Sequence, residues 1–158
     1  DIAPQIKTLI QHYRGDLPDD AMFLSSNLSK ISIPIASDGV RAGLPSHASS
    51  HVGAHLDFNN YLVKNESATF GVYVKGDSMI NAGMEEGDLL VVDRSIEPLH
   101  KDIVIVEIEN EFTVKRLIKT TSGVELHPEN DDYPIIRPTA ESTLSIVGVV
   151  LYSIKKTW

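Results

Sequence analysis

The chain of 158 residues contains no cysteine. Disulfide bonds, thiolate metal sites and a cysteine nucleophile are therefore excluded, and the composition suits a reducing compartment. Long hydrophobic runs are also missing, because no apolar stretch approaches the ~20 residues that a membrane-spanning helix needs. No amino-terminal signal peptide is recognisable. We therefore expect a cytoplasmic protein that does not enter a membrane.

Basic residues are scarce as well. Lysine and arginine together number 14, against 22 acidic residues, which gives a net charge of −8 and a pI near 5.1. The densest basic groups are only two residues long, at Lys115-Arg116 and Lys155-Lys156. A surface without a basic cluster repels nucleic-acid phosphates. Direct DNA binding by this chain is not expected.

The apolar residues that are present, 42% of the chain, suffice for one core. Beyond Ala68 they fall into short alternating or continuous runs separated by turn residues, and Glu109–Glu111 is typical of a hairpin turn. Many short strands of this kind indicate a mainly β domain. The predicted strands are Phe70–Val74, Leu89–Val92, Ile103–Ile108, Phe112–Ile118, Val124–Leu126, Tyr133–Ile136 and Leu144–Ile154.

The first part of the chain has a different character. Residues 4–13 predict a short helix, with Ile6, Leu9, Ile10 and Tyr13 on one apolar face that docks on the protein itself or on a partner. The Ser-rich residues 25–43 predict an extended arm with little core of its own. Residues 44–62 predict a short irregular helix and a docking segment.

One candidate for chemistry is Ser78, in a tight Gly76-Asp77-Ser78-Met79 corner. Serine is a poor nucleophile unless a neighbouring group takes its proton. None of the six histidines sits in a recognisable triad signature, although histidines close in space stay possible.

The other candidate base is Lys115, which lies within a predicted strand and shares one face with Thr113 and Leu117. Burial among apolar groups would lower its pKa and leave a neutral amine that can accept a proton. The alternative is an edge-strand lysine that discourages aggregation.

Five short motifs occur in order along the chain. They are Gly76–Met79, Gly87–Leu90, Asp102–Ile105, Glu111–Leu117 and Pro128–Asn130. In this order and at this spacing they resemble the core of the LexA/UmuD family of self-cleaving Ser-Lys proteins, over Arg41 to Ile154. The interval of 37 positions from Ser78 to Lys115, and of 35 from Gly43 to Ser78, resembles the UmuD branch.

The resemblance implies a role for each candidate residue. Ser78 is implied as the nucleophile and Lys115 as the general base. The backbone N–H groups of Asp77 and Ser78 are implied as the donors that stabilise the oxyanion. Ala42-Gly43 is implied as the bond that is cut, because the family cuts between a small residue and glycine. No metal or organic cofactor is implied.

The resemblance also implies the architecture and the partners. We expect a single, mainly β LexA/UmuD-like C-terminal domain with an extended N-terminal arm: residues 1–42 are the removable arm, 43–67 a docking segment, and 68–158 the catalytic and dimerisation domain. The implied protein is a homodimeric SOS-response mutagenesis protein. A RecA–single-stranded DNA filament stimulates its self-cleavage, and the shortened form joins a UmuC-like translesion DNA polymerase.

Three other interpretations stay open. The chain could be the C-terminal part of a LexA-like or phage-type repressor whose DNA-binding domain lies before Asp1, and Ala42 is typical of LexA proteins. The 42 residues before the cut contain no convincing helix-turn-helix, which favours the UmuD type. A signal peptidase also uses serine and lysine but needs a membrane anchor. A dimerisation module that no longer cuts is the non-enzymatic interpretation.

Three histidines, His47, His51 and His55, are spaced four residues apart and would share one helical face. Such spacing can bind a metal ion. Gly53 weakens a helix here, however, and no acidic residue completes the set. We interpret the three histidines as a polar surface and expect no metal site.

Overall fold

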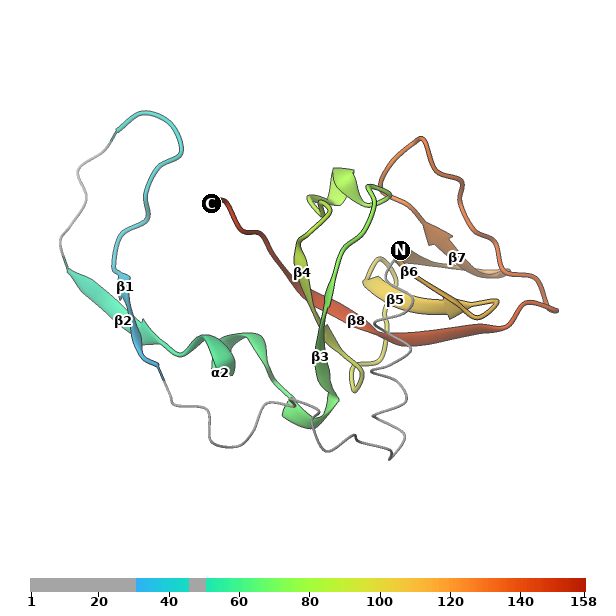
Figure 1. Ribbon diagram of the computed structural model, residues 1–158, viewed down its shortest axis with the longest axis horizontal. Coiled ribbons are helices and arrows are strands. Elements are labelled where there is room, and N and C mark those ends of the chain that lie inside the picture. Colours follow the sequence, from blue (N-terminus) through green and yellow to red (C-terminus); the bar gives the residue numbers. More distant parts are fainter. Residues whose placement is uncertain (1–30, 46–50) are drawn as a thin grey trace. The chain divides into compact units, whose positions relative to one another are not determined.

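The computed structural model describes residues 31–45 and 51–158. They belong to two compact units, Met22–Lys64 and a second one that contains Asn65–Trp158 (Figure 1). The helix predicted over residues 4–13 and the part of the predicted arm before Ile31 lie outside the described residues. No helix of the described ranges is long and apolar enough to cross a membrane.

The Met22–Lys64 unit contains an antiparallel pair of strands, β1 (Ile33–Ala36) and β2 (Val52–Leu56), and the helix α2 (Phe58–Leu62). Nearly all side chains of the two strands are exposed. The side chain of Asp57 caps the helix by accepting a hydrogen bond from the backbone N–H of Asn59 at 3.0 Å. Within the described residues, this unit therefore has no buried core of its own.

The helix predicted within residues 44–62 is only partly correct, because Val52–Leu56 forms a strand. Its residues pair with β1 in the register Ile33↔Leu56. At Gly53 a Cβ atom would lie 2.9 Å from the Cα atom of Ser37, so the two backbones approach too closely for a larger residue. His55 lies in β2, so the shared helical face predicted for the histidines is wrong. His47 lies outside the described residues.

The Asn65–Trp158 unit is built on one six-stranded antiparallel sheet, and the predicted mainly β fold is confirmed. The strand order is β3-β4-β8-β5-β6-β7, so the last strand runs between β4 and β5 (Figure 1). Two short 3-10 helices, η1 (Glu66–Ala68) and η2 (Ile80–Ala82), flank β3. The strands are β3 (Thr69–Tyr73), β4 (Leu89–Asp93), β5 (Ile103–Ile108), β6 (Glu111–Thr120), β7 (Gly123–His127) and β8 (Leu144–Ile154).

Two of the connections follow from turn and proline chemistry. The hairpin between β5 and β6 is the predicted one, and Glu109 and Asn110 both have positive φ angles, of 49° and 63°. The strand predicted over Tyr133–Ile136 is wrong, because this segment makes only an isolated bridge between Leu126 and Ile136. Pro134 and Pro138 lack the N–H groups that a longer ladder needs.

Buried side chains cover both faces of the sheet around β5. Ile105 belongs to one apolar cluster, whereas its neighbours Val104 and Val106 belong to the other, as expected for alternation along a strand. The first cluster includes Phe70, Val72, Val74, Met79, Met84, Leu90, Val92, Phe112, Val114 and Val147, and the second includes Leu117, Leu126 and Val149. The strands at the centre of the sheet are therefore shielded from water on both sides.

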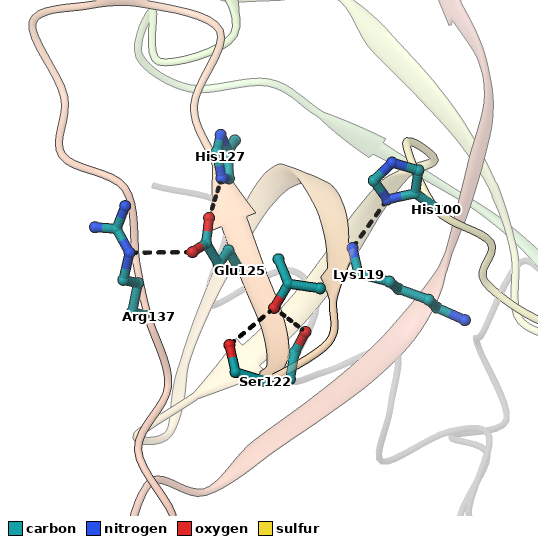
Figure 2. A network of polar contacts seen from close by, with 8 residues as sticks. His100, Lys119, Ser122, Glu125, His127 and Arg137 are labelled. Atoms are coloured by element: carbon teal, nitrogen blue, oxygen red, sulfur yellow. Dashed lines mark hydrogen bonds and ion pairs between the residues drawn. The ribbon is translucent and has the colours of Figure 1, made fainter.

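The edge strand β7 is held by a polar network (Figure 2). The carboxylate of Glu125 contacts the ring of His127 at 2.6 Å and accepts a hydrogen bond from Arg137 at 3.1 Å. Hydrogen bonding to His127, followed by that to Arg137, lowers the pKa of Glu125. Because His127 and Arg137 flank the segment 128–136, both ends of that segment are fixed to β7.

Candidate active site

Ser78 lies in the turn between β3 and η2. Gly76 enters this turn with a φ of 79°, a conformation that favours glycine. The backbone N–H of Ile80 donates to the carbonyl of Asp77 at 3.1 Å and closes the turn. Met79 is 1% exposed in the first apolar cluster, so it anchors the turn directly behind the serine. The serine itself is half-buried.

A second turn, at Gly87, is hydrogen-bonded to the segment that leads into the turn of Ser78. The backbone N–H of Gly87 donates to the carbonyl of Val74, and the N–H of Val74 donates to the carbonyl of Asp88, each at 2.9 Å. Gly87 has a φ of 93°, in the left-handed region. The two turns are therefore joined by backbone hydrogen bonds, which fixes the end of β3 just before Ser78.

Lys115 lies in the middle of β6 and is 6% exposed. It pairs across the sheet with Val104, which is fully buried, and shares its strand face with Leu117. Burial lowers the pKa of Lys115. Within the described residues Lys115 makes no salt bridge, so no carboxylate is present there to restore the charged form.

The Nζ atom of Lys115 has three polar neighbours. It lies 3.0 Å from Oγ of Ser78, 2.9 Å from Oγ1 of Thr113 and 3.1 Å from the carbonyl oxygen of Val114. A neutral amine has two N–H donors and one lone pair. It can donate to Thr113 and Val114 and keep the lone pair for the hydroxyl of Ser78, which is the arrangement that proton abstraction requires.

The peptide groups beside Ser78 are held by their carbonyl oxygens. The carbonyl of Ser78 accepts from the backbone N–H of Glu129 at 2.8 Å, and that of Asp77 accepts from the side chain of Asn130 at 3.0 Å. Among the described residues, neither the N–H of Asp77 nor that of Ser78 donates a hydrogen bond. Two N–H groups next to the serine are therefore available to a substrate oxygen.

A pocket of about 440 Å³ opens beside Ser78 and Lys115. Apolar and small groups from β6 and from the segment after β7 line it, among them Phe112, Thr113, Tyr133 and Ile136. The pocket borders the serine and the lysine, so an extended peptide bound there could present a carbonyl group to Ser78.

Ala42 and Gly43 lie in an exposed bend after β1. They belong to the Met22–Lys64 unit, whereas Ser78 and Lys115 belong to the other. The structure thus brings together the predicted serine and lysine within one unit. Sequence reasoning did not assign functions to Thr113, Asn130 or Tyr133. Thr113 gave a signal, since it lies two residues from Lys115 on the same strand face, and Asn130 lies in the Pro128–Asn130 motif.

A hydroxyl beside a buried amine is a pair of groups that can serve as nucleophile and base. Comparison with known proteins agrees. The Peptidase S24-like family matches residues 34–151. The chain is 43% identical to Protein ImpA of Escherichia coli over 124 residues, which cover 78% of this chain and 84% of ImpA.

Two further relatives represent the two branches of the family that the motifs resemble. Protein MucA of Escherichia coli is 41% identical over 136 residues, which cover 84% of this chain and 92% of MucA. The LexA repressor of Delftia acidovorans is 36% identical over 132 residues, which cover 84% of this chain but 58% of the repressor. The chain therefore belongs to the S24-like peptidase family, as the UmuD-like member of the LexA/UmuD group that its motifs predict.

Proposed function

We propose that the protein cuts its own chain between Ala42 and Gly43, with Ser78 as nucleophile and Lys115 as general base. The observation that carries this proposal is the 3.0 Å distance between Nζ of Lys115 and Oγ of Ser78 at a site where burial lowers the pKa of the lysine. A hydrogen bond of this length lies within reach for direct proton transfer.

The proposed reaction has two steps. Neutral Lys115 takes the hydroxyl proton of Ser78 while Oγ bonds to the carbonyl carbon of Ala42, and the N–H groups of Asp77 and Ser78 stabilise the oxyanion. The bond to Gly43 then breaks, and the lysine ammonium gives its proton to the leaving amine. Water attacks the resulting ester while Lys115 accepts a proton from it. The bond from the carbonyl carbon to Oγ then breaks, Lys115 returns the proton to Oγ of Ser78, and Ala42 ends in a new carboxyl group, which loses its proton to solvent.

We propose the same division of the chain that the motifs imply. Residues 1–42 are the removable arm, 43–67 a docking segment, and 68–158 the catalytic and dimerisation domain. Because the arm is part of the same chain, its docking at the site makes the reaction intramolecular. This can lower the barrier to the cut by roughly 7–11 kcal/mol relative to a reaction between two separate molecules. The position of Ala42 and Gly43 in an exposed bend supports this division.

The direct test is intact mass followed over time at pH 7.5 and pH 10 for the wild type, Ser78→Ala and Lys115→Ala. We expect the wild type to give two fragments that meet at Ala42-Gly43, faster at pH 10, because the higher pH deprotonates Lys115. Both variants should stay whole. Cutting at another bond, or cutting in Ser78→Ala, would contradict the assigned nucleophile.

The proposed biological role is that of a cytoplasmic, homodimeric SOS mutagenesis protein, which the similarity to ImpA and MucA supports. A RecA–single-stranded DNA filament stimulates the cut by binding the cleavable state better than the resting state. We expect the purified filament to accelerate cutting at pH 7.5. A rate of cutting that the filament leaves unchanged would contradict the proposed role of RecA.

The shortened product is proposed to act as an accessory subunit of a UmuC-like translesion polymerase. Coprecipitation of purified components tests this, and the Gly43–Trp158 product should bind the polymerase more strongly than uncut Ser78→Ala does. A second candidate function, part of a LexA-like repressor, is supported by the likeness to the Delftia LexA repressor. A helix-turn-helix domain encoded before Asp1 in the gene would favour the repressor.

A further inference from the structure

The segment after β7 forms a short loop, Pro128–Tyr133, that is fixed at several points. Leu126 and Ile136 exchange two backbone hydrogen bonds of 2.9 Å across its base. Arg137 and His127, on either side, both contact Glu125 (Figure 2). Within the loop, the backbone N–H of Tyr133 donates to the carbonyl of Asn130 at 3.1 Å. The loop therefore has a defined conformation.

This loop directs a series of donors to the turn that carries the nucleophile. The backbone N–H of Glu129 donates to the carbonyl of Ser78 at 2.8 Å. The amide Nδ2 of Asn130 donates to the carbonyl of Asp77 at 3.0 Å, and the hydroxyl of Tyr133 donates to Oδ1 of Asp77 at 2.6 Å. The turn returns one bond, from the N–H of Asn81 to the carbonyl of Glu129 at 2.8 Å.

The same loop is attached to the strand that carries the lysine. Arg116, the neighbour of Lys115, donates from Nε to the carboxylate of Glu129 and from a terminal nitrogen to the carbonyl of Lys101. Arg116 also pairs with His127 in the register of β6 and β7. One loop thus contacts both the strand of the base and the turn of the nucleophile, which suits a part that fixes their relative position.

The peptide bond between Asp77 and Ser78 explains why Asn130 matters most. In a trans peptide the C=O and the N–H point in opposite directions within one plane. A donor that holds the carbonyl of Asp77 therefore also sets the direction of the Ser78 N–H. The N–H of Ile80 holds this oxygen from within the turn, and Asn130 holds it from the loop. Asn130 is suited to this task, because its Oδ1 accepts from the N–H of Asp132 at 3.0 Å while its Nδ2 reaches Asp77.

We propose that Asn130 is a positioning residue that aims the backbone N–H of Ser78 at the oxyanion by holding the carbonyl of Asp77, with Tyr133 in a supporting role on the side chain of Asp77. This inference rests on the proposed function, since it concerns the same cut. Asn130 touches neither the hydroxyl of Ser78 nor the amine of Lys115 in the hydrogen bonds of the described residues.

The test is the rate of self-cleavage against pH for the full chain, in the wild type and in Asn130→Ala. The N–H is used only when the oxyanion forms, so its misalignment should lower the plateau rate at high pH roughly threefold to tenfold, the range that one net hydrogen bond supplies. The pH of half-maximal rate should not move, because it reports the pKa of Lys115.

Two companion variants make the result specific. Tyr133→Phe keeps the ring and removes only the hydroxyl, so a smaller fall of about twofold is expected. Ser122→Ala is the control, because it removes an exposed hydroxyl that contacts Thr120 in the turn between β6 and β7 of the same unit. It should cut at the wild-type rate. Thermal unfolding of each variant shows whether the fold is kept.

The possible outcomes separate the two proposals. A plateau within twofold of wild type in folded Asn130→Ala would overturn the positioning role, and so would a rise in the midpoint pH, which would mean that water had reached Lys115. If Asn130→Ala does not fold, Tyr133→Phe decides: a plateau about twofold below wild type with an unchanged midpoint supports the proposal, and a full wild-type rate or a raised midpoint overturns it. A wild type that never cuts, or a Ser78→Ala that does, would refute the proposed function itself.

Discussion

The two units of the chain differ in what holds them together. In the Asn65–Trp158 unit, six strands carry apolar clusters on both faces of β5. Among the described residues of the Met22–Lys64 unit, two strands with exposed side chains pair only with one another, and a lone two-stranded hairpin is marginally stable in water. The candidate catalytic pair sits in the first unit and the candidate cut site in the second. A rigid scaffold suits groups that do chemistry, and a segment with little core suits a site that must enter a cleft.

The largest effect on self-cleavage is expected when Lys115, in the Asn65–Trp158 unit, is replaced. Lys115→Met should stop self-cleavage and at the same time stabilise the unit at pH 7 by roughly 1–3 kcal/mol, because a buried amine without a carboxylate partner is costly to charge. Intact mass measures the first effect and urea unfolding the second. Lys119→Met, an exposed lysine of the same strand, is the matched control and should change neither.

The pH dependence of that stability has a defined sign. The folded-state pKa of Lys115 lies below its ordinary value of 10.5, so the folded protein gains stability as pH rises through the interval between the two. Lys115→Met lacks this gain, and its advantage should shrink toward zero above pH 10.5. A variant that is less stable than wild type at pH 7 would contradict the account.

The next effect concerns the cut site in the small unit. Gly43→Ala should slow cutting about tenfold or more, since one extra methyl in a fitted site costs roughly 1–3 kcal/mol. In the structure a Cβ atom at Gly43 meets nothing within 4 Å, so the fold tolerates the change. Gly39→Ala is equally free of contacts and serves as the control. Equal cutting by both variants, measured by intact mass, would argue against Gly43 at the cut.

A pair of glycine substitutions compares the units directly. At Gly148 a Cβ atom would lie 2.7 Å from Cγ1 of Val92 and 3.0 Å from the carbonyl oxygen of Asp93, whereas at Gly53 it would lie 2.9 Å from Cα of Ser37. Both clashes are severe, but only the first lies in a core. Gly148→Ala should lower the free energy of unfolding by about 1–3 kcal/mol.

Gly53→Ala should leave that main transition, followed by circular dichroism in urea, within about 0.5 kcal/mol of wild type. The expected difference arises because the hairpin contributes few buried contacts. If Gly53→Ala also lowered the main transition by more than about 1 kcal/mol, the two units would unfold as one.

A smaller loss of stability than that of Gly148→Ala is expected on replacing Asp88, which is 4% exposed. The backbone N–H of Glu85 and then the ammonium of Lys155, which lies 2.7 Å from Oδ2, lower the pKa of Asp88 below its ordinary 3.8. Asp88→Asn should therefore cost about 1–2 kcal/mol at pH 7. The difference from wild type should disappear as pH falls through the lowered pKa, because the carboxylate is then protonated.

Glu85→Gln is the control for Asp88→Asn. Glu85 also contacts Lys155, at 3.1 Å, but its side chain is 60% exposed, and exposed ion pairs contribute little. Urea unfolding at pH 7 and pH 3 measures both variants. A cost at pH 3 as large as that at pH 7 would mean that the charge of Asp88 is not responsible.

The sequence predicts the strands of the Asn65–Trp158 unit better than those of the Met22–Lys64 unit, for physical reasons. Strands such as Ile103–Ile108 are apolar on both faces, so a run of consecutive apolar residues predicts that they are buried. The structure places this strand at the predicted residues. Val52–Leu56 has no such pattern, because its strand forms by pairing with a distant exposed segment. The strand predicted at Tyr133–Ile136 fails because a proline pattern outweighs its β-forming residues.

Some contacts of the candidate site could be predicted from the sequence, and others could not. Thr113 and Lys115 share a face in any strand, so their proximity could be predicted from spacing alone. The contacts of Asn130 and Tyr133 with Asp77 join residues that are 53 and 56 positions apart. They depend on how one loop folds over another, which no local periodicity encodes. Family resemblance identified the motif of Asn130 but not what its side chain contacts.

The central claim is that Lys115 stands beside Ser78 as an amine that loses its charge easily. The most direct measurement is the titration of the Lys115 Cε signal by NMR between pH 6 and pH 12, assigned by its absence in Lys115→Met and compared with the pH profile of self-cleavage. We predict a pKa below 10.5 that coincides with the midpoint of the cleavage profile. A pKa at or above 10.5, or a cleavage midpoint unrelated to it, would contradict the role of Lys115 as the general base.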